Sequence, residues 1–192
     1  MLLAACGDQE TGEPTSQPTA AVGSTPDGSG TDNVNTPEIP NPVQDLGTYK
    51  QDPCRMLTPQ QASRIGFPRS EQDPEDTSGA SCDWRGHRGS RASITLQSGK
   101  QSALAGYYQV HAEDPEAYAY FKPVVIAGYP AVFATDFDDR DSGSCAMTVA
   151  LTDRDVLRMS NALFLGTAQR DDPCAQLQQT AELAVKTISA GK

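Results

Sequence analysis

Cys6 has the most readable chemistry in the chain, because it follows the small and apolar run Leu3-Ala4-Ala5 and precedes Gly7. This is the pattern of a bacterial lipobox, where a peptidase cleaves before the cysteine and the thiol takes a diacylglycerol. We expect Cys6 to carry a lipid anchor with fatty acyl chains such as palmitate, and residues 1–6 to be a signal-peptide remnant. A full signal peptide has roughly 7–15 apolar residues before its cleavage site. We therefore expect the rest of it upstream.

The other four cysteines are an even number: Cys54, Cys82, Cys145 and Cys174. Cysteines in exported proteins usually form disulfides. No pair has Cys-x-x-Cys spacing, and neither histidine stands at ligand spacing to a cysteine, so nothing indicates a zinc site. We predict two disulfides.

The segment 136–143 is the densest cluster of carboxylates, with Asp136, Asp138, Asp139 and Asp141. Alternate carboxylates on a loop suit a hard cation such as Ca²⁺. An EF-hand loop, however, needs an acceptor, a Gly and a Glu where this segment has Arg140, Asp141 and Met147. We expect a solvated acidic loop, with weak calcium binding as the alternative, and no metal or other cofactor.

Catalytic patterns are missing from the sequence. His87 lies in a Gly- and Arg-rich turn and His111 at the end of an amphipathic stretch. Neither accompanies a Gly-x-Ser-x-Gly elbow, and His-Glu-x-x-His and phosphate-binding loops do not occur. We therefore predict no catalytic residues and no enzyme activity.

Arg85, Arg88 and Arg91 form a basic cluster around the turn that holds His87. Local positive potential attracts anionic lipid headgroups, cell-wall polymers or an acidic protein. The simpler interpretation is a solubilising turn. These three arginines are the candidate contact for an anionic partner.

Tyr107, Tyr108 and Tyr129 belong to the most aromatic part of the chain. Half-exposed tyrosines are suited to gripping sugars or flat ligands. Packing of a helix on a sheet explains the same residues equally simply. They are the candidate ligand contacts.

Charge and composition divide the chain of 192 residues, which has a net charge of −10. Residues 7–46 contain seven of the 25 acidic residues, no Lys or Arg, and too few apolar residues to nucleate a core. Such a Thr-, Ser-, Pro- and Gly-rich segment does not offset its ordering entropy, so we predict a disordered acidic tether. The acidic balance also argues against nucleic-acid binding, which requires a basic face.

Residues 47–192 are enough for a single domain that buries about two-thirds of its unfolded surface. The sequence contains no run of about 18 apolar residues and therefore predicts no transmembrane helix. Helices are expected after the capping box of Thr58, ending at Gly66, after Ser102 and after Asp172. Alternating apolar residues predict strands around 82–84, 93–97, 124–127, 131–135, 145–151 and 156–164, with a turn at Gly128-Tyr129-Pro130.

This order predicts an α+β fold, a mostly antiparallel sheet of about six strands with helices packed on it. The strand that begins at Cys145 and the strand that ends at Phe164 share one edge, close to the helix that begins at Cys174. This favours Cys145–Cys174, and by elimination Cys54–Cys82. The alternative, Cys54–Cys174 with Cys82–Cys145, would join the two Asp-Pro-Cys helix starts.

Several short motifs together resemble one family. They are Asp52-Pro53-Cys54, Cys82-Asp83-Trp84, Gly128-Tyr129-Pro130-Ala131, Cys145 and Asp172-Pro173-Cys174. In this order they are similar to a secreted lipoprotein family of high-GC actinomycetes that carries a domain of unknown function, over about residues 50–190. The resemblance implies a lipidated, disulfide-bearing envelope protein and supplies no catalytic residues.

We therefore expect a protein held by lipid on the outer face of the cytoplasmic membrane. The favoured role is a non-catalytic binding or protein-partner module that meets an envelope protein, a lipid or a glycan. The alternative is a structural scaffold of the envelope without a ligand pocket. An enzyme is the least favoured class.

Overall fold

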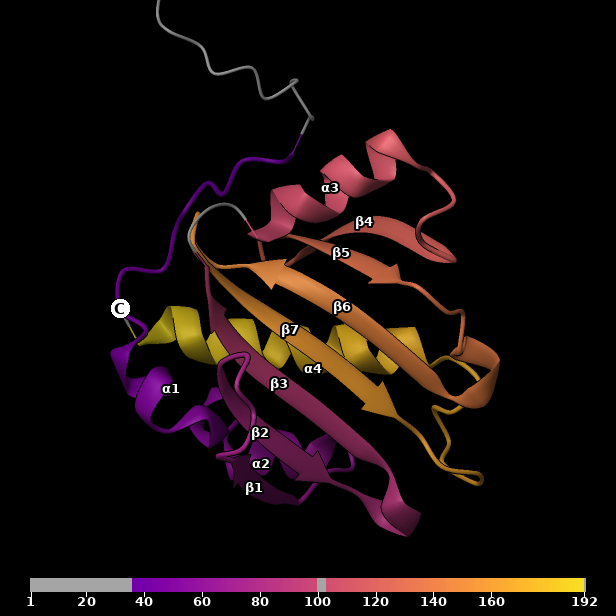
Figure 1. Ribbon diagram of the computed structural model, residues 1–192. Helices are drawn as coiled ribbons and strands as arrows, with labels where there is room; N and C mark the ends of the chain where they lie inside the picture. Colours follow the sequence, from indigo (N-terminus) through magenta and orange to yellow (C-terminus); the bar gives the residue numbers. More distant parts are fainter. Residues whose placement is uncertain (1–35, 100–102, 192) are drawn as a thin grey trace, which may run out of the picture. The chain divides into compact units, whose positions relative to one another are not determined.

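A computed structural model describes residues 36–99 and 103–191, which all belong to one compact unit and contain a seven-stranded antiparallel sheet (Figure 1). The helices are α1 (Gly47–Gln51), α2 (Pro59–Arg64), α3 (Ala103–Glu113) and α4 (Pro173–Ala190), with short 3₁₀ turns at Pro53–Met56, His87–Gly89 and Arg140–Ser142. The strands are β1 (Arg69–Asp73), β2 (Ala80–Arg85), β3 (Arg91–Ser98), β4 (Tyr120–Ile126), β5 (Tyr129–Thr135), β6 (Ser144–Ala150) and β7 (Asp155–Ala162).

The strands lie in the order β1-β2-β3-β7-β6-β5-β4, and every neighbouring pair is antiparallel. The α+β class is thus confirmed, with one strand more than the pattern predicted. The additional strand is β1, whose five residues are all exposed and polar. It pairs along the edge of β2 through its backbone, so its sequence carries no apolar alternation from which a strand could be recognised.

Helix α4 covers one face of the sheet (Figure 1). Asp172 caps its first turn by accepting a hydrogen bond from the Ala175 N–H at 3.0 Å, and Pro173 occupies the first helical position. The stripe Leu177, Ala181, Ala184 and Ile188 is fully buried, as predicted, against the inward-facing residues of the central strands. Burying this apolar stripe is the main attachment of α4 to the sheet.

Helix α3 lies on the opposite face and covers only part of it. A small apolar cluster holds it there: Leu104, Val132, Ala150 and Val156. The sequence neighbours of these strand residues, such as Ala131 and Leu157, belong to the larger core under α4, because strand side chains alternate between faces. The middle of this second face stays open.

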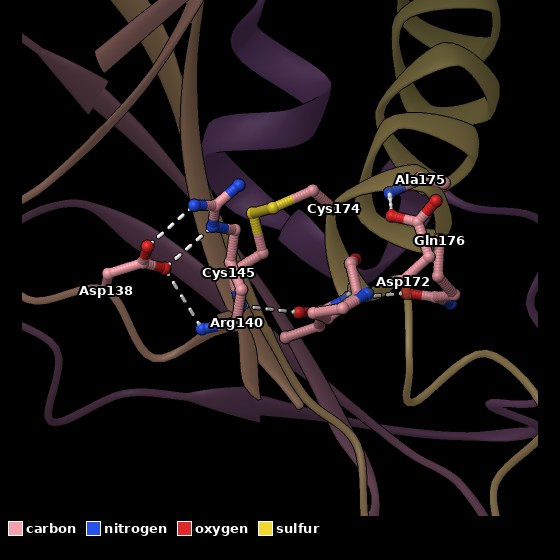
Figure 2. Close-up of a disulfide and its surroundings, with 9 residues drawn as sticks. Asp138, Arg140, Cys145, Asp172, Cys174, Ala175 and Gln176 are labelled. Atoms are coloured by element: carbon pink, nitrogen blue, oxygen red, sulfur yellow. Dashed lines mark hydrogen bonds and ion pairs between the residues drawn. A yellow bond between two sulfur atoms is a disulfide. The ribbon is translucent and has the colours of Figure 1, made fainter. Parts of the chain in front are cut away.

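Both predicted disulfides of the favoured pairing are present. Cys54–Cys82 joins the turn Pro53–Met56 to β2, and Cys145–Cys174 joins the start of β6 to the first turn of α4 (Figure 2). The alternative pairing does not form. Each bridge spans a similar stretch of chain, with sequence separations of 28 and 29 residues.

The folded part begins before residue 47. Val43 and Leu46 are buried in the main core, and the Val43 N–H donates to the Leu151 carbonyl at 3.0 Å. This corrects the C-terminal boundary of the predicted tether: a few spaced apolar residues cannot nucleate a core, but they can complete an existing one. The remainder of the tether, Cys6 and the expected helix cap Ser102 lie outside the described residues.

The β4–β5 turn lies earlier than predicted. It consists of Ala127 and Gly128, with φ values of 49° and 89°, and both residues of a type I′ turn require positive φ. Tyr129 and Pro130, expected in the turn, are instead the first residues of β5. Pro130 is compatible with the sheet because it lies at the start of β5, where a strand tolerates a residue without a backbone N–H.

Candidate ligand groove on the open sheet face

Strands β5 and β6 diverge, and this opens the sheet. Their ladder consists of two residue pairs, Ala131 with Val149 and Val132 with Thr148. The neighbouring ladders β4–β5 and β6–β7 each contain seven pairs. Figure 1 shows the end of β5 separating from the start of β6, with the loop 136–143 bridging them. Side chains at this end are therefore spread apart.

Two depressions on the open face follow this divergence. One, of about 420 Å³, lies beside the β5–β6 loop, and the other, of about 250 Å³, extends across β7 to β3. They share the lining residues Tyr107, Ala134, Ala146, Arg158 and Ser160. We refer to the two together as the groove. Its size is in the range of small-molecule sites, about 300–1,000 Å³.

The floor of the groove is low because its side chains are small. The outward positions of β3, β6 and β7 carry mostly small side chains, of which one is an alanine and four have hydroxyl groups: Ser93, Thr95, Ala146, Thr148 and Ser160. Alternate positions, such as Ile94 and Met159, face α4 and fill the core. The middle of the open face is thus rich in hydroxyl groups, while the other face is apolar.

Aromatic residues form the wall beside α3. Tyr107 and Tyr118 have ring centroids 6.1 Å apart, and both line the larger depression together with Tyr120. Tyr118 in turn stacks on Phe121 at 5.7 Å. Burial raises the pKa of Tyr118, and the nearby Tyr107 and Asp136 raise it further, so its phenol stays protonated at neutral pH.

The remaining rings of this cluster hold α3 against β4 rather than reach the groove. His111 stacks on Phe121 with centroids 3.9 Å apart, and Tyr108 meets the same ring edge-on at 5.6 Å. The Tyr108 hydroxyl is buried without a hydrogen-bond partner among the described residues, and burial raises its pKa. Tyr108 and His111 therefore serve packing.

Arg158 lies in the middle of the floor, between Thr95 of β3 and Thr148 of β6 in the strand register. It lines both depressions, its residue is exposed, and among the described residues it forms no ion pair. It is the cation that an incoming anionic group would meet.

Arg140, at the mouth of the groove, is already occupied. Its guanidinium lies 3.9 Å from the Tyr120 ring centroid and donates to Asp138 from Nε and Nη2 at 2.7 and 2.6 Å (Figure 2). Hydrogen bonds from Arg140 hold the pKa of Asp138 below its usual value despite opposing desolvation. This pair shapes the loop and the position of Tyr120.

The carboxylates proposed for weak calcium binding do not converge. Asp136 and Asp139 line the groove, Asp138 is bound by Arg140, and Asp141 lines a separate depression at the start of α4. Across the described part of the chain, no group of three or more His, Cys, Asp or Glu residues is placed to hold a metal ion. All four carboxylates belong to exposed residues.

The three tyrosines predicted as ligand contacts lie in three different environments. Tyr107 lines the groove, Tyr108 packs against Phe121, and Tyr129 is only 5% exposed in the core under α4. The prediction for Tyr129 is corrected, because its place in β5 points it inward. Arg85, Arg88 and Arg91 are at one end of the sheet and do not line the groove.

Sequence reasoning missed Arg140 and Arg158 as groove residues. Arg158 had a usable signal, since it is the basic residue at an outward position of β7. Tyr118 and Tyr120 belong to the same aromatic part of the chain as the candidate tyrosines, but which of these rings meet depends on how α3 and β4 are placed.

A larger depression of about 600 Å³ lies on the other face, at the first turn of α4. Charges of both signs surround it: Lys122, Arg140, Arg170, Asp141, Asp171 and Asp172. Asp172 is used as the helix cap (Figure 2). Mixed charge around a cap favours no particular ligand, so the groove is the better candidate.

None of the helices in residues 36–99 and 103–191 has the length and apolar character needed to cross a membrane. The model of a family described as "Protein of unknown function (DUF3558)" matches residues 1–187. Neither a curated protein nor a solved structure matches the chain.

Proposed function

The chain belongs to the DUF3558 family of proteins of unknown function, and from this premise we propose that it is a lipid-anchored envelope protein that binds an anionic oligosaccharide in the groove. Catalysis is not part of this role. Its place is the outer face of the cytoplasmic membrane. Support for the location comes from the lipobox of Cys6 and from the two disulfides, which persist in oxidising compartments. We also infer that the family is the secreted lipoprotein family of high-GC actinomycetes that the motifs resemble.

The observation that carries the binding role is Arg158. A cation that forms no ion pair with any described residue lies in a hydroxyl-rich floor, next to the aromatic wall of Tyr107 and Tyr118. Tyrosine rings pack on the apolar faces of sugar rings, and hydroxyl groups such as those of Ser160 and Thr148 exchange hydrogen bonds with sugar hydroxyls. A guanidinium binds carboxylate or phosphate in a bidentate manner.

A non-catalytic role is supported by the same lining. No histidine is among the described residues that line the groove. The carboxylate Asp76 does accept hydrogen bonds from Ser78 and Thr95 there, but these bonds, that from Ser78 foremost, lower the pKa of Asp76 and so make it a weak base. The groove is also half-open, whereas catalytic sites usually exclude water. A glycan held in this way is bound and released unchanged.

The test is an NMR titration of the full chain carrying Cys6→Ser, with both disulfides formed. The probes are tetragalacturonate, which is acidic, and chitotetraose, which is neutral. We expect tetragalacturonate to shift the amide signals of Tyr107, Ala146, Arg158 and Ser160, and to bind at least tenfold more weakly to Arg158→Gln.

The matched control is Arg154→Gln, which removes an exposed arginine from the β6–β7 turn outside the groove. It should bind like the unsubstituted protein. If neither probe shifts the groove signals, or if Arg158→Gln binds tetragalacturonate unchanged, the proposal is overturned and an envelope scaffold without a ligand becomes the better account.

A further inference from the structure

Three arginines stand in one row across the end of the sheet. The register places Arg69 of β1 directly opposite Arg85 of β2, and Arg85 directly opposite Arg91 of β3. Directly opposed residues share a face, and like charges in such positions repel each other. A row of this kind works against sheet stability and concentrates positive potential at this end.

Nearby carboxylates neutralise only part of this charge. Arg85 lies 3.6 Å from Glu71, and Arg91 lies 3.9 Å from Asp83, both with arginine side chains about half exposed. Arg69 reaches the Gly86 carbonyl at 3.4 Å. Among the described residues it forms no ion pair, and neither does Arg88. Two of the four arginines at this end are therefore paired with a carboxylate, and two carry positive charge that no described carboxylate neutralises.

An apolar pair lies against the same turn. Phe164 and Leu165, in the loop after β7, are 58% and 66% exposed. The loop is held to the turn because the Phe164 N–H donates to Ser90 Oγ at 3.0 Å, and Ser90 Oγ is 3.0 Å from Thr167 Oγ1. The pair is thus kept in water rather than folded onto the core.

Arg88 connects the basic turn to this loop. Its backbone has φ 55°, in the left-handed region that residues other than Gly rarely adopt. A Cβ on Gly166 would lie 3.0 Å from one Arg88 Nη atom, so the guanidinium is beside the Phe164-Leu165 loop. We call this surface, made of Arg69, Arg85, Arg88, Arg91, Phe164 and Leu165, the arginine end.

We propose that the arginine end docks on an anionic phospholipid surface. The guanidinium groups pair with headgroup phosphates, and Phe164 and Leu165 enter the boundary between headgroups and acyl chains. A soluble polyanion would use the arginines and leave the apolar pair in water. A stable protein interface buries about 800 Å² on each partner around an apolar centre, whereas the apolar part of the arginine end consists of two side chains.

The described start of the chain lies away from the arginine end. The chain from residue 36 joins the domain beside Leu151, near the start of β7, whereas the arginine end lies beyond Ala162 at the end of β7. Docking at the arginine end does not require the groove, so the two proposals fail independently.

The test is sedimentation of the full Cys6→Ser chain, with disulfides formed, with vesicles of phosphatidylcholine alone or with half phosphatidylglycerol. We expect binding to the anionic vesicles only. Each arginine near such a surface contributes about fivefold in affinity, so Arg85→Gln with Arg88→Gln should weaken binding about 25-fold. Phe164→Ser with Leu165→Ser should weaken it at least tenfold at unchanged charge.

The control is Arg154→Gln with Val125→Ser, which removes one exposed arginine and one exposed apolar residue away from the arginine end. It should bind anionic vesicles normally, as should Arg158→Gln, the groove variant. Near-ultraviolet circular dichroism verifies that each variant is folded. Equal binding to both vesicle types, or full binding by the Phe164 and Leu165 variant, would overturn lipid docking; the latter would indicate a polyanion instead.

Discussion

Asn161 of β7 and Gln176 of α4 form a hydrogen bond of 2.8 Å in a site where both side chains are buried. Asn161 also accepts from the Cys145 N–H at 3.0 Å and donates to the Pro173 carbonyl at 2.7 Å. One amide thus joins β6, β7 and α4 beside the Cys145–Cys174 disulfide. Buried polar groups that are fully partnered orient the elements they connect.

The first prediction concerns this amide. Asn161→Ala leaves the Cys145 N–H, the Pro173 carbonyl and Gln176 without their buried partner. Each buried polar group that is left unpaired costs about 1–3 kcal/mol of folding free energy. We expect the free energy of unfolding in urea to fall by about 3 kcal/mol or more. Ser160→Ala, an exposed neighbour on the other face, should change it by less than about 0.5 kcal/mol. A small loss for Asn161→Ala would show that this network contributes little.

The second prediction concerns the disulfides. Replacing Cys145 and Cys174 by Ala should lower stability by about 3–4 kcal/mol, because a bridge closing a loop of this length restricts the unfolded chain. Replacing Cys54 and Cys82 by Ala should lower stability by a similar amount, since the two bridges have sequence separations of 28 and 29 residues. Urea unfolding measures both. Thiol titration of the denatured, unlipidated chain should find one free thiol, that of Cys6; three or more would contradict the pairing.

The third prediction is a pH dependence at Asp155. Burial pushes its pKa upward, but hydrogen bonds from Ser98, Lys50 and Thr152 outweigh burial and hold the pKa below its ordinary value of 3.8. A carboxylate with a lowered pKa stabilises the fold above that ordinary value and loses its contribution as pH falls through the folded pKa. Asp155→Asn should therefore lower stability by about 1–2 kcal/mol at pH 7 and by less at pH 3.

The measurement for Asp155 is Tm at both pH values. Asp153→Asn, an exposed carboxylate of the same turn, serves as the comparison and should leave Tm nearly unchanged at pH 7. A destabilisation by Asp155→Asn that is the same at pH 3 and pH 7 would show that the charge of Asp155 plays no part.

The fourth prediction is a stabilising change in the β4–β5 turn. Ala127 has φ 49°, which is unfavourable for a residue with a Cβ, and Asn accepts this region better. Ala127→Asn creates the Asn-Gly pair that type I′ turns favour, and we expect a gain of about 0.5–1 kcal/mol. Gly128→Ala, at φ 89°, should instead destabilise. A loss of stability in Ala127→Asn would refute the turn assignment.

The fifth prediction concerns the anchor. When expressed in a lipoprotein-processing host together with the upstream part of its signal peptide, the unsubstituted protein should fractionate with membranes and carry the mass of its acyl chains on Cys6. Cys6→Ser should move it to the soluble fraction without changing its urea unfolding, because the described core does not include Cys6. Membrane fractionation and intact-protein mass spectrometry make the measurement. An unmodified Cys6 in the wild-type protein is the result that contradicts lipidation.

Several parts of the fold could be predicted from short stretches of sequence. Thr58 and Gln61 form the capping box of α2, Cys82 and Trp84 share the inner face of β2, and the stripe from Leu177 to Ile188 packs on the sheet. Each depends on neighbours two to four residues away. The same holds for the preferred pairing of Cys145 with Cys174, which needed only adjacent strand and helix ends.

Other parts could not be predicted because their partners are distant in the sequence. The polar strand β1 is recognisable only beside β2, and Val43 becomes core only beside Leu151. Tyr129 was expected in an exposed turn, but the turn consists of Ala127 and Gly128, so Tyr129 begins β5 and its side chain is buried in the core under α4.

The sequence by itself determined that two disulfides form, that an acidic segment precedes the domain and that the fold is α+β, because these follow from composition and local periodicity. Only the tertiary structure decided which side chains share a surface. The divergence of β5 from β6 brings Tyr107 and Arg158 to one groove, and the strand register sets Arg69 beside Arg85. Both depend on backbone pairing and packing between segments far apart in the chain, which no local pattern encodes.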